Sequence, residues 1–365
     1  MPRPEPELAP EPAAAFSARL IEWQGRHGRH ALPWQNTRDP YRVWLSEVML
    51  QQTQVATVLG YYVRFLQRFA NVEALAAASL DEVFAQWSGL GYYSRARNLH
   101  ACAQAVVAQH GGRFPASSAE LAALPGIGRS TAAAIAAFCF GERVAILDGN
   151  VKRVLTRVLG FEGDLAEAKQ ERALWAKATE LLPEIGIERY TQGLMDLGAT
   201  LCTPRAPACL LCPVHGHCAA ARAGTQERFP VKTRRLKRGT REHVWLWLRW
   251  RGDVWLEQRP VTGVWAGLWS LPEFDSTAAF EAASAAWPGR GESLPSFTHV
   301  LTHLDWRLHP MRWTLPDRLG AVRRAQIESA WPSGRWFSSD EALAAGLPSP
   351  LRKLLGAAAS TSSAM

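Results

Sequence analysis

Four cysteines lie within a short stretch of the chain, at the spacing Cys202-x6-Cys209-x2-Cys212-x5-Cys218. Thiolates this close together in sequence have one common physical use, which is to surround a metal centre with sulfur ligands. A tetrahedral zinc ion fits that description, with His215 or His217 as a substitute for one cysteine. An iron–sulfur cluster fits it too, because clusters also take four thiolates at irregular spacing. The spacing alone leaves both open.

Length, composition and net charge limit the classes of protein to which this chain can belong. The chain has 365 residues, 47% apolar and 20% charged, which predicts two folded domains and excludes a mostly disordered chain. Its net charge of +8 suggests an anionic partner such as nucleic acid. Nearly all of the excess lies in residues 222–241, which hold eight basic side chains and one acidic one. The charge is therefore concentrated in a connector.

No targeting or membrane segment is evident in the sequence. Residues 1–12 are rich in Pro and Glu and lack a basic and apolar leader. The longest apolar run, 132–140, is far shorter than the roughly 20 residues that span a bilayer. Cys102 and Cys139 lie in apolar helical contexts and are expected to be buried thiols. Because a disulfide framework is not expected in a chain of this length, we expect a reducing compartment, the cytoplasm.

The hydrophobic period changes along the chain. Up to residue 221 apolar side chains recur at helical spacing and no segment alternates like a strand, which predicts an all-α domain. After Arg241 apolar residues alternate, and a turn at residues 251–253 leads to a second strand at 253–258, which predicts a hairpin. A further strand at 306–315 and a helix at 277–286 complete an α+β domain.

This gives an expected domain organisation. We expect a flexible tail at 1–15, an α-helical domain at 16–221 with the cysteine loop at 202–218, a basic linker at 222–241, an α+β domain at 242–356 and a second tail at 357–365.

The segment Leu124-Pro-Gly-Ile-Gly-Arg-Ser-Thr131 joins two predicted helices. Gly126 and Gly128 let the backbone turn sharply and present its amides, and the next helix adds partial positive charge at its N-terminus. Such a loop suits a phosphate group. It is typical of a helix–hairpin–helix DNA-binding element, although a plain glycine-rich turn has the same sequence.

A carboxylate follows the hairpin in Asp148-Gly149-Asn150, directly before the segment Val151–Val158. Asp148 or Asn150 suits the N-cap of that helix. A carboxylate near a phosphate-binding hairpin is equally well placed to face a sugar whose glycosidic bond is breaking. Lys152, Arg153 and Arg157 either form a solvated basic face or neutralise phosphates.

Glu47 lies three residues after Trp44 and three before Leu50, so it shares a helix face with large apolar groups. Burial there would raise the pKa of its carboxyl group and keep a proton available for general acid catalysis, whereas an ordinary surface Glu would do neither. Gln51, Gln52 and Gln54 form a polar face or reach into a duplex as hydrogen-bonding wedges.

Together these motifs resemble adenine DNA glycosylases of the MutY type, in the helix–hairpin–helix glycosylase superfamily. The matching runs are Glu47–Val55, Gly89-Leu-Gly-Tyr-Tyr93, the hairpin, Ile146–Arg153 and the four cysteines, in the family's order. The resemblance covers about residues 20–350. It implies excision of adenine mispaired with 8-oxoguanine or guanine, after the base has been flipped out of duplex DNA.

The resemblance also implies roles for individual residues in catalysis. Glu47 is expected to protonate adenine N7, and Asp148 to stabilise the oxocarbenium-like sugar, as two carboxylates do in glycoside hydrolysis. Asn150 would support the sugar and water side. Ser130 stands where endonuclease-III-type lyases carry a lysine that forms a Schiff base, so the enzyme is expected to be monofunctional and to leave an abasic site. Lys152 is assigned no catalytic role.

Binding residues follow from the same resemblance. The expected DNA contacts are Gln52, Leu90, Tyr92, Gly126, Gly128, Arg129 and Lys152. The expected wall of the adenine pocket is Trp34, Leu50, Val55 and Gln192. The expected metal centre is a [4Fe–4S] cluster on Cys202, Cys209, Cys212 and Cys218, which supports DNA binding, with zinc as the alternative.

The C-terminal part resembles the family's Nudix-like module for reading 8-oxoguanine. The run Trp265–Phe274 carries this resemblance, while the Glu-rich metal signature of Nudix hydrolases is absent from the sequence, so no pyrophosphatase activity is expected. The family's Phe-Ser-His lesion loop corresponds here to Leu301, Thr302 and His303, so the aromatic side chain is lost. That departure bears on how strongly this loop selects 8-oxoguanine.

Two other functions compete with adenine excision. One is a bifunctional glycosylase and lyase that acts on oxidised pyrimidines, and the other is a zinc protein that binds DNA without catalysis. The expectation that we carry forward is a monomeric, cytoplasmic enzyme of bacterial type that works on duplex DNA at the nucleoid, away from membranes.

Overall fold

The computed structural model describes residues 10–233 and 237–362 and divides into two compact units. Of the described residues, unit 1 comprises 10–62, 71–76 and 101–233, and unit 2 comprises 63–70, 77–100 and 237–362. The helical segment 77–100 therefore belongs to the same compact unit as the C-terminal sheet, although it lies inside the sequence range assigned to the helical domain.

Every regular element in the described residues up to 233 is helical, which agrees with the predicted all-α class. The helices are α1 (Pro10–His27), α2 (Pro40–Leu50), α3 (Val55–Arg68), α4 (Val72–Ala77), α5 (Leu80–Trp87), α6 (Ser94–His110), α7 (Ser118–Leu121), α8 (Arg129–Ile135), α9 (Gly149–Leu159), α10 (Ala168–Glu180), α11 (Ile187–Thr200) and α12 (Ala219–Ala223), with a π-helical turn at Ala136–Phe140 and 3₁₀ turns at Cys209–Leu211, His215–His217 and Gln226–Arg228.

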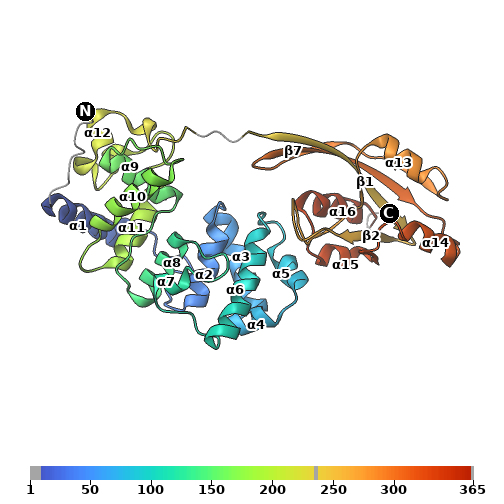
Figure 1. Cartoon of the computed structure of the whole chain (residues 1–365), viewed down its shortest axis with the longest axis horizontal. Coiled ribbons are helices and arrows are strands. Elements are labelled where there is room, and N and C mark those ends of the chain that lie inside the picture. The colour runs from blue at the N-terminus through green and yellow to red at the C-terminus, as the bar shows by residue number, and fades with distance from the viewer. Residues whose placement is uncertain (1–9, 234–236, 363–365) are drawn as a thin grey trace. The chain divides into compact units, whose positions relative to one another are not determined.

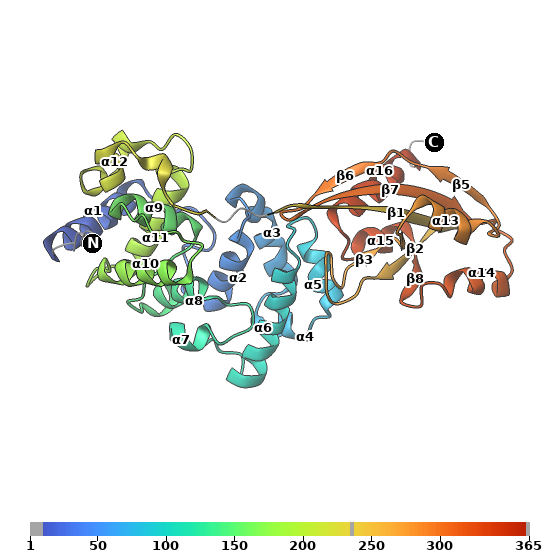
Figure 2. The ribbon, with the colours of Figure 1, turned by 45° about the horizontal axis from the view of Figure 1, so that its top comes forward.

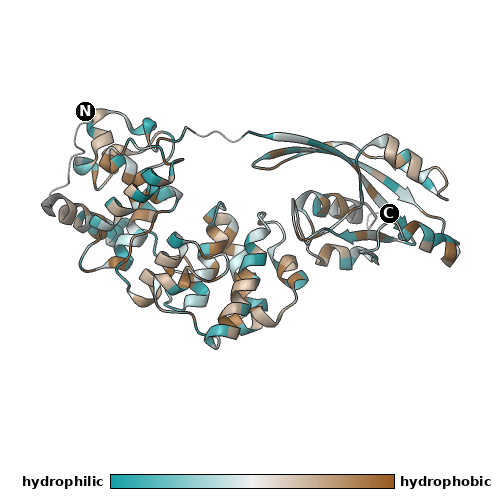
Figure 3. Ribbon diagram, viewed as in Figure 1, coloured by the Kyte–Doolittle hydropathy of each residue, from teal (hydrophilic) through white to brown (hydrophobic). Residues whose placement is uncertain are grey.

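The core of unit 1 is built around α9 and α11, which pack against each other (Figure 1). The buried positions Val151, Val154, Leu155 and Val158 recur every three or four residues along α9, so they form one apolar face. Helix α1 packs on α11, where the rings of Phe16 and Tyr190 meet edge to face. Both hydrophobic and hydrophilic residues occur along these helices (Figure 3), as expected of amphipathic helices.

The ends of unit 1 differ from the sequence expectations. Helix α1 begins at Pro10, so residues 10–15 are helical and the expected tail is wrong there. The expected linker is also shorter, because residues 222–233 pack on unit 1. Phe229 is buried in its core, and the Val231 carbonyl accepts a hydrogen bond from Leu165 N at 3.1 Å. Arg234 and Arg235 of the expected linker lie outside the described residues.

The C-terminal part of unit 2 is a mixed sheet with helices, as predicted. Its strands are β1 (Gly239–Trp250), β2 (Asp253–Gln258), β3 (Trp269–Ser270), β4 (Glu273–Phe274), β5 (Arg290–Ser293), β6 (Phe297–Val300), β7 (Leu304–Thr314) and β8 (Gly334–Phe337), and its helices are α13 (Thr277–Ser284), α14 (Ala321–Glu328), α15 (Ser339–Ala344) and α16 (Ser349–Ser362). Helix α16 includes residues 357–362, so the expected second tail is wrong there. None of the helices in the described residues is long and apolar enough to cross a membrane.

The sheet is organised around two long strands (Figure 2). Strands β1 and β7 pair in parallel from Gly239 opposite Leu304 to Arg249 opposite Thr314, and the path of the sheet is β3-β2-β1-β7-β5. Strands β1 and β2 form the predicted antiparallel hairpin. Alternation along β1 is typical of a strand with one face exposed to solvent. Here both faces are buried, since Trp245 and Trp247 are buried as well as Val244 and Leu246. Trp245 packs on Trp265, so the sheet is covered on both faces at this strand.

Residues 77–100 are docked on the C-terminal part of unit 2 by polar and close apolar contacts. The hydroxyl group of Tyr93 donates to the Leu347 carbonyl at 2.8 Å, and Arg97 Nη1 donates to the Ala266 carbonyl at 2.7 Å. Gly346 allows a close approach, because a Cβ atom there would lie 2.5 Å from Phe84 Cβ. The loop 89–93 between α5 and α6 is thereby fixed to the C-terminal sheet domain.

Candidate functional site

A cleft of about 1080 Å³ opens in unit 1 between the end of α1 with the loop that follows it, α2, the start of α9, and α11. Among the residues that line it are two carboxylates, one amide beside them and four residues of the expected adenine pocket: Glu47, Asp148, Asn150, Trp34, Leu50, Val55 and Gln192. The structure thus brings together residues that are as far apart in sequence as Trp34 and Gln192. It leaves Ser130 outside the lining of this cleft.

Glu47 is held in the cleft by the packing of α2. Asp39 caps this helix, with its side chain accepting from Tyr41 N at 2.9 Å, and Pro40 occupies the first turn, where its missing N–H costs nothing. Trp44 and Val48 are buried on either side of Glu47 in sequence. Burial, assisted by the nearby Asp148 carboxylate, raises the pKa of Glu47 from 4.5 to about 8. Glu47 is therefore protonated at neutral pH.

Asp148 combines the two roles that its sequence position left open. It is the N-cap of α9, where its Oδ1 accepts a hydrogen bond from Val151 N at 2.7 Å, and it also lines the cleft. Burial raises the pKa of its carboxyl group, while the backbone hydrogen bonds and the charges of Arg153 and Lys152 act in the opposite direction. Glu47 and Asp148 thus have different environments, which suits them to different protonation states.

Asn150 is fixed from two sides. Its Oδ1 accepts a hydrogen bond from Arg153 Nη2 at 2.8 Å, and the same guanidinium group donates to the carbonyls of Gly198 and Cys202. Gly198 on α11 lies directly against it, since a Cβ atom there would be 2.7 Å from Asn150 Cβ. Because Gly198 has no side chain, the first turn of α9, which carries Asn150, can pack closely against α11.

The hairpin has the geometry that its sequence predicts. Gly126 adopts φ +74°, which favours glycine, and Gly128 starts α8. Ile127 between them is buried, while both glycines and Arg129 are exposed. Ser130 lies behind the exposed turn, where its Oγ accepts from Leu147 N at 3.0 Å. The hairpin is thus an exposed loop anchored by one apolar side chain.

The basic residues near the hairpin have intramolecular partners. Lys152 pairs with Glu171, and the guanidinium group of Arg129 lies 4.0 Å from the ring centroid of Trp175. Arg153 and Arg157 are buried rather than exposed to phosphates, so the expectation that they neutralise DNA is wrong. Arg157 donates instead to the Thr203 and Pro204 carbonyls in the cysteine loop. Both arginines therefore hold the cysteine loop by hydrogen bonds from α9 to its backbone carbonyls.

The four cysteines converge, as the spacing indicates. All four line one apolar cavity, together with Val154, Arg157 and Leu197. Burial, together with the proximity of the other three cysteines, raises the pKa of the Cys212 thiol to about 12. No three His, Cys, Asp or Glu side chains in the described residues are arranged to hold a single metal ion. Cys102 is buried and Cys139 half-buried, outside this loop.

The expected wedge residues lie on strained backbone. Gln52 in unit 1 is exposed at φ +58°, and Tyr92 in unit 2 is 46% exposed at φ +48°, which few non-glycine residues adopt. Leu90 is buried, so its side chain is not presented at the surface. Arg95 holds this loop, since it donates to the Leu90 and Gly91 carbonyls and lies over the Tyr92 ring.

The expected lesion loop meets Tyr92 within unit 2. Leu301, Thr302 and His303 form the connection between β6 and β7, closed by a hydrogen bond from Leu301 N to the Leu304 carbonyl. Thr302 and His303 are exposed. The hydroxyl groups of Tyr92 and Thr302 lie 3.0 Å apart. Two segments that are 210 residues apart in sequence therefore share one surface.

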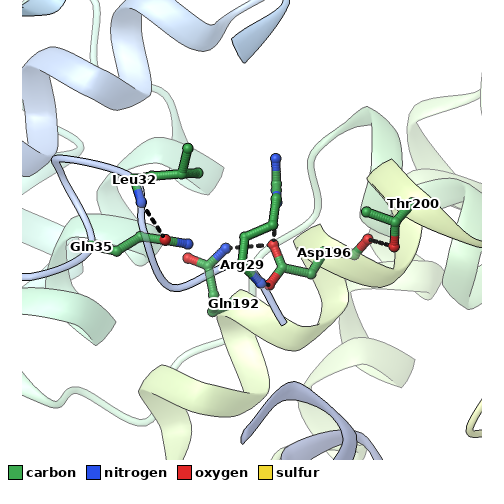
Figure 4. Close-up of polar contacts among 6 residues, drawn as sticks. All are labelled: Arg29, Leu32, Gln35, Gln192, Asp196 and Thr200. Atoms are coloured by element: carbon green, nitrogen blue, oxygen red, sulfur yellow. Dashed lines mark hydrogen bonds and ion pairs between the residues drawn. The ribbon is translucent and has the colours of Figure 1, made fainter. Parts of the chain in front are cut away.

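Sequence reasoning missed Arg29 and Gln35, which line the cleft, and Asp196, a buried carboxylate that accepts hydrogen bonds from Arg29 and Gln192 (Figure 4). Asp196 is four residues after Gln192 on α11, and this helical spacing is a signal that could have found it. Arg29 has no such signal, because its contact with Asp196 spans 167 residues of sequence.

Comparisons with known proteins show the family of the chain. Two family models match the chain, HhH-GPD superfamily base excision DNA repair protein at residues 45–180 and NUDIX domain at residues 243–357. The adenine DNA glycosylase of Buchnera aphidicola from Schizaphis graminum is 31% identical, over 93% of this chain and 97% of that protein. The human adenine DNA glycosylase is 31% identical, over 93% of this chain and 73% of that protein. A solved thermostable thymine-DNA glycosylase is similar with a TM-score of 0.53 and 28% identity, over 58% of this chain and 98% of that one.

Proposed function

The chain belongs to the adenine DNA glycosylases, and we propose that its substrate is adenine paired with 8-oxoguanine or guanine in duplex DNA. Excision of adenine from DNA is the activity of the family, so the reaction is hydrolysis of an N-glycosidic bond. The observation that carries the proposal is the pair of carboxylates, Glu47 and Asp148, that faces a cleft with room for a base flipped out of the helix.

Glu47 acts as the general acid. With a pKa raised to about 8, its carboxyl group holds a proton at neutral pH and can deliver it to adenine N7. Protonation turns the base into a neutral leaving group, which weakens the bond between the base and the sugar. The apolar packing of α2 that raises this pKa is therefore part of the catalytic machinery.

Asp148 stabilises the positive charge that develops on the sugar. Its Oδ1 is engaged by Val151 N at the start of α9, which fixes the carboxylate at the cleft wall. Asn150, held by Arg153, lies beside it and supports the sugar and the attacking water. Ser130 has no amine to form a Schiff base, so the product is an abasic site and the strand stays intact.

Cys202, Cys209, Cys212 and Cys218 would hold a [4Fe–4S] cluster. Four thiol side chains around one apolar cavity form the donor set that such clusters take. When bound, the cluster would act structurally, by fixing the loop 202–218. Arg157, which donates to Cys202 Sγ at 3.3 Å, would connect that loop to α9.

DNA contacts would come from two surfaces. In unit 1 the exposed hairpin at Gly126 and Gly128 presents backbone amides to phosphates, with Arg129 and Lys152 released from their internal partners. In unit 2 the exposed Tyr92 and the 301–303 loop would read the base opposite adenine. We further propose that the enzyme works as a monomer in a bacterial cytoplasm.

A single-turnover assay tests the proposal. Duplexes that carry adenine opposite 8-oxoguanine, guanine or thymine are cleaved with alkali after the reaction, and the strand break reports base release. We expect release opposite 8-oxoguanine and guanine, little opposite thymine, and no break without alkali. Equal release opposite thymine would contradict the mispair assignment, and breaks without alkali, with borohydride trapping, would favour the lyase. A colourless protein with zinc and no iron would contradict the cluster.

A further inference from the structure

Asp196 on α11 is a carboxylate with 0% exposure, and its partners Arg29 and Gln192 line the cleft. Its Oδ2 accepts a hydrogen bond from the Arg29 backbone N–H at 2.9 Å, and its Oδ1 accepts from Arg29 Nε at 2.7 Å and from Gln192 Nε2 at 2.8 Å (Figure 4). A buried carboxylate is costly unless it is paired and hydrogen-bonded, and Arg29 supplies both. Its position therefore reflects a specific arrangement of the cleft wall.

This carboxylate decides which way the Gln192 amide faces. An ionised carboxylate only accepts hydrogen bonds, so the amide must present its nitrogen to Asp196. The amide is planar, and its oxygen is therefore turned to the other side. Figure 4 shows this oxygen directed away from Asp196 and toward the Gln35 side chain, and both glutamines line the cleft.

Gln35 supplies the complementary group. Its Oε1 accepts a hydrogen bond from Leu32 N at 3.2 Å, so its Nε2 is the end that remains for another partner. Within the part of the chain that the structure describes, this nitrogen is buried and has no hydrogen-bond partner. A buried donor without an acceptor costs about 1–3 kcal/mol, which a ligand can recover. The wall thus offers a donor on Gln35 beside an acceptor on Gln192.

Adenine carries the matching pair of groups. Its exocyclic amino group donates, and the ring nitrogen next to it accepts. Guanine and hypoxanthine carry the reverse pair, an oxygen acceptor and a ring N–H donor. A site with fixed polar groups rejects a base that leaves those groups unpaired.

Resting on the proposed function, we propose that Asp196, held by Arg29, is a positioning residue that locks the Gln192 amide with its oxygen toward the cleft. This wall then accepts the amino group of adenine and rejects purines with an oxygen at that position. The close approach of Arg29 to Asp196 depends on Gly28, because a Cβ atom there would lie 2.5 Å from the Gln24 carbonyl oxygen and 3.0 Å from Asp196 Oδ2.

The test combines Asp196→Asn with three target bases opposite 8-oxoguanine: adenine, purine without the amino group, and hypoxanthine. The asparagine amide both donates and accepts, so the Gln192 amide is free to turn over. We expect single-turnover release of adenine to fall about tenfold, the loss of roughly one hydrogen bond. Release of purine should change less than about twofold, and hypoxanthine should gain relative to adenine.

Two further variants separate positioning from structure. Gln35→Met removes the donor to the ring nitrogen, which adenine and purine share, so both bases should lose rate alike. Glu184→Gln makes the same carboxylate-to-amide change at a residue outside the cleft lining, where the side chain is 88% exposed, and should change no ratio. If Asp196→Asn does not fold, Arg29→Lys should show the same selective loss of adenine release.

The outcomes are distinguishable. If Asp196→Asn lowers adenine and purine release by the same factor, or leaves their ratio unchanged, Asp196 has only a structural role and the inference is overturned. If the wild-type enzyme releases no adenine from any duplex, the proposed function itself fails. If the wild-type enzyme releases adenine and Asp196→Asn loses adenine release selectively, with purine release little changed, both proposals are supported.

Discussion

The cleft of unit 1 and the Tyr92–Thr302 surface of unit 2 hold their functional side chains in different ways. In the cleft, Glu47 and Asp148 are partly buried and are fixed by a capped helix and by a helix N-terminus. On the surface, Tyr92 is held by a positive φ angle, an arginine over its ring and one hydroxyl pair with Thr302.

The difference teaches where rigidity is needed. A proton donor must keep a shifted pKa, which only a constant, largely dry environment maintains. A side chain that enters DNA must move into a partner whose shape also changes. Substitutions in the cleft should therefore act on the rate of base release, and those on the surface should act on the choice of duplex.

Glu47→Gln should have the largest effect. It removes the proton donor and keeps the size and packing of the side chain, so adenine release should fall by about a thousandfold or more, while binding to the mispair persists. Single-turnover rates and a binding assay on one duplex check this. Glu180→Gln, an exposed carboxylate on α10, is the matched control. Substantial release by Glu47→Gln would show that another group supplies the proton.

The pH dependence should be the next largest effect. Because the folded-state pKa of Glu47 is raised from 4.5 to about 8, the competent acid form persists at neutral pH, and release should fall about tenfold per pH unit above pH 8. The folded state also binds this proton more tightly than the unfolded chain does. The free energy of unfolding, relative to Glu47→Gln, should therefore fall as pH rises from about 4.5 to 8. A rate that stays flat to pH 10 would contradict the assignment.

The hydroxyl pair on the surface should matter less. Tyr92→Phe and Thr302→Val each remove one hydroxyl group, and each should lower the preference for 8-oxoguanine over guanine by about threefold, as expected of one exposed hydrogen bond. Because both act through the same contact, the double variant should resemble either single one. Fully additive losses would mean that the two hydroxyl groups act independently.

The smallest effect per residue should come from the basic segment 222–241, the range that the sequence assigned to a linker. Changing Arg228, Lys232, Lys237 and Arg241 together to Gln should weaken binding to matched and mismatched duplexes alike and flatten its salt dependence. The same number of changes among Arg318, Arg323, Arg251 and Arg290, outside the linker, is the control. A loss confined to mispaired duplexes would place these residues with the lesion-reading surface instead.

Local patterns in the sequence predicted much of the fold and the site. Helical spacing, the glycines of the hairpin and the cysteine spacing are local signals, and each led to an element or a cluster that the structure contains. The hairpin of β1 and β2 followed from alternation and a turn. The pocket roles of Trp34, Leu50, Val55 and Gln192 stay predictions, although all four line the cleft.

What the sequence did not predict depends on contacts between distant residues. The sequence around Arg153 and Arg157 is typical of a basic helix face, but both side chains are buried. Partners of both lie in the cysteine loop, more than 40 residues away, so no local pattern indicates this burial. The role of Asp196 depends on Arg29, and the burial of Trp245 depends on Trp265. The linker starts only after residue 233, because Phe229 is anchored in the core of unit 1.

The docking of residues 77–100 on the C-terminal part has a consequence for dissecting the enzyme. Phe84 packs under Gly346, and Tyr93 is bonded to Leu347, so a fragment that ends at residue 241 would strip these partners from α5 and α6. Such a fragment would keep Glu47 and Asp148 but would uncover apolar surface beside the Tyr92 loop. A loss of activity in this fragment would then have two causes, the disturbed packing of α5 and α6 and the absence of the 301–303 loop. Fragments of this enzyme should therefore follow its compact units rather than a single boundary in the sequence.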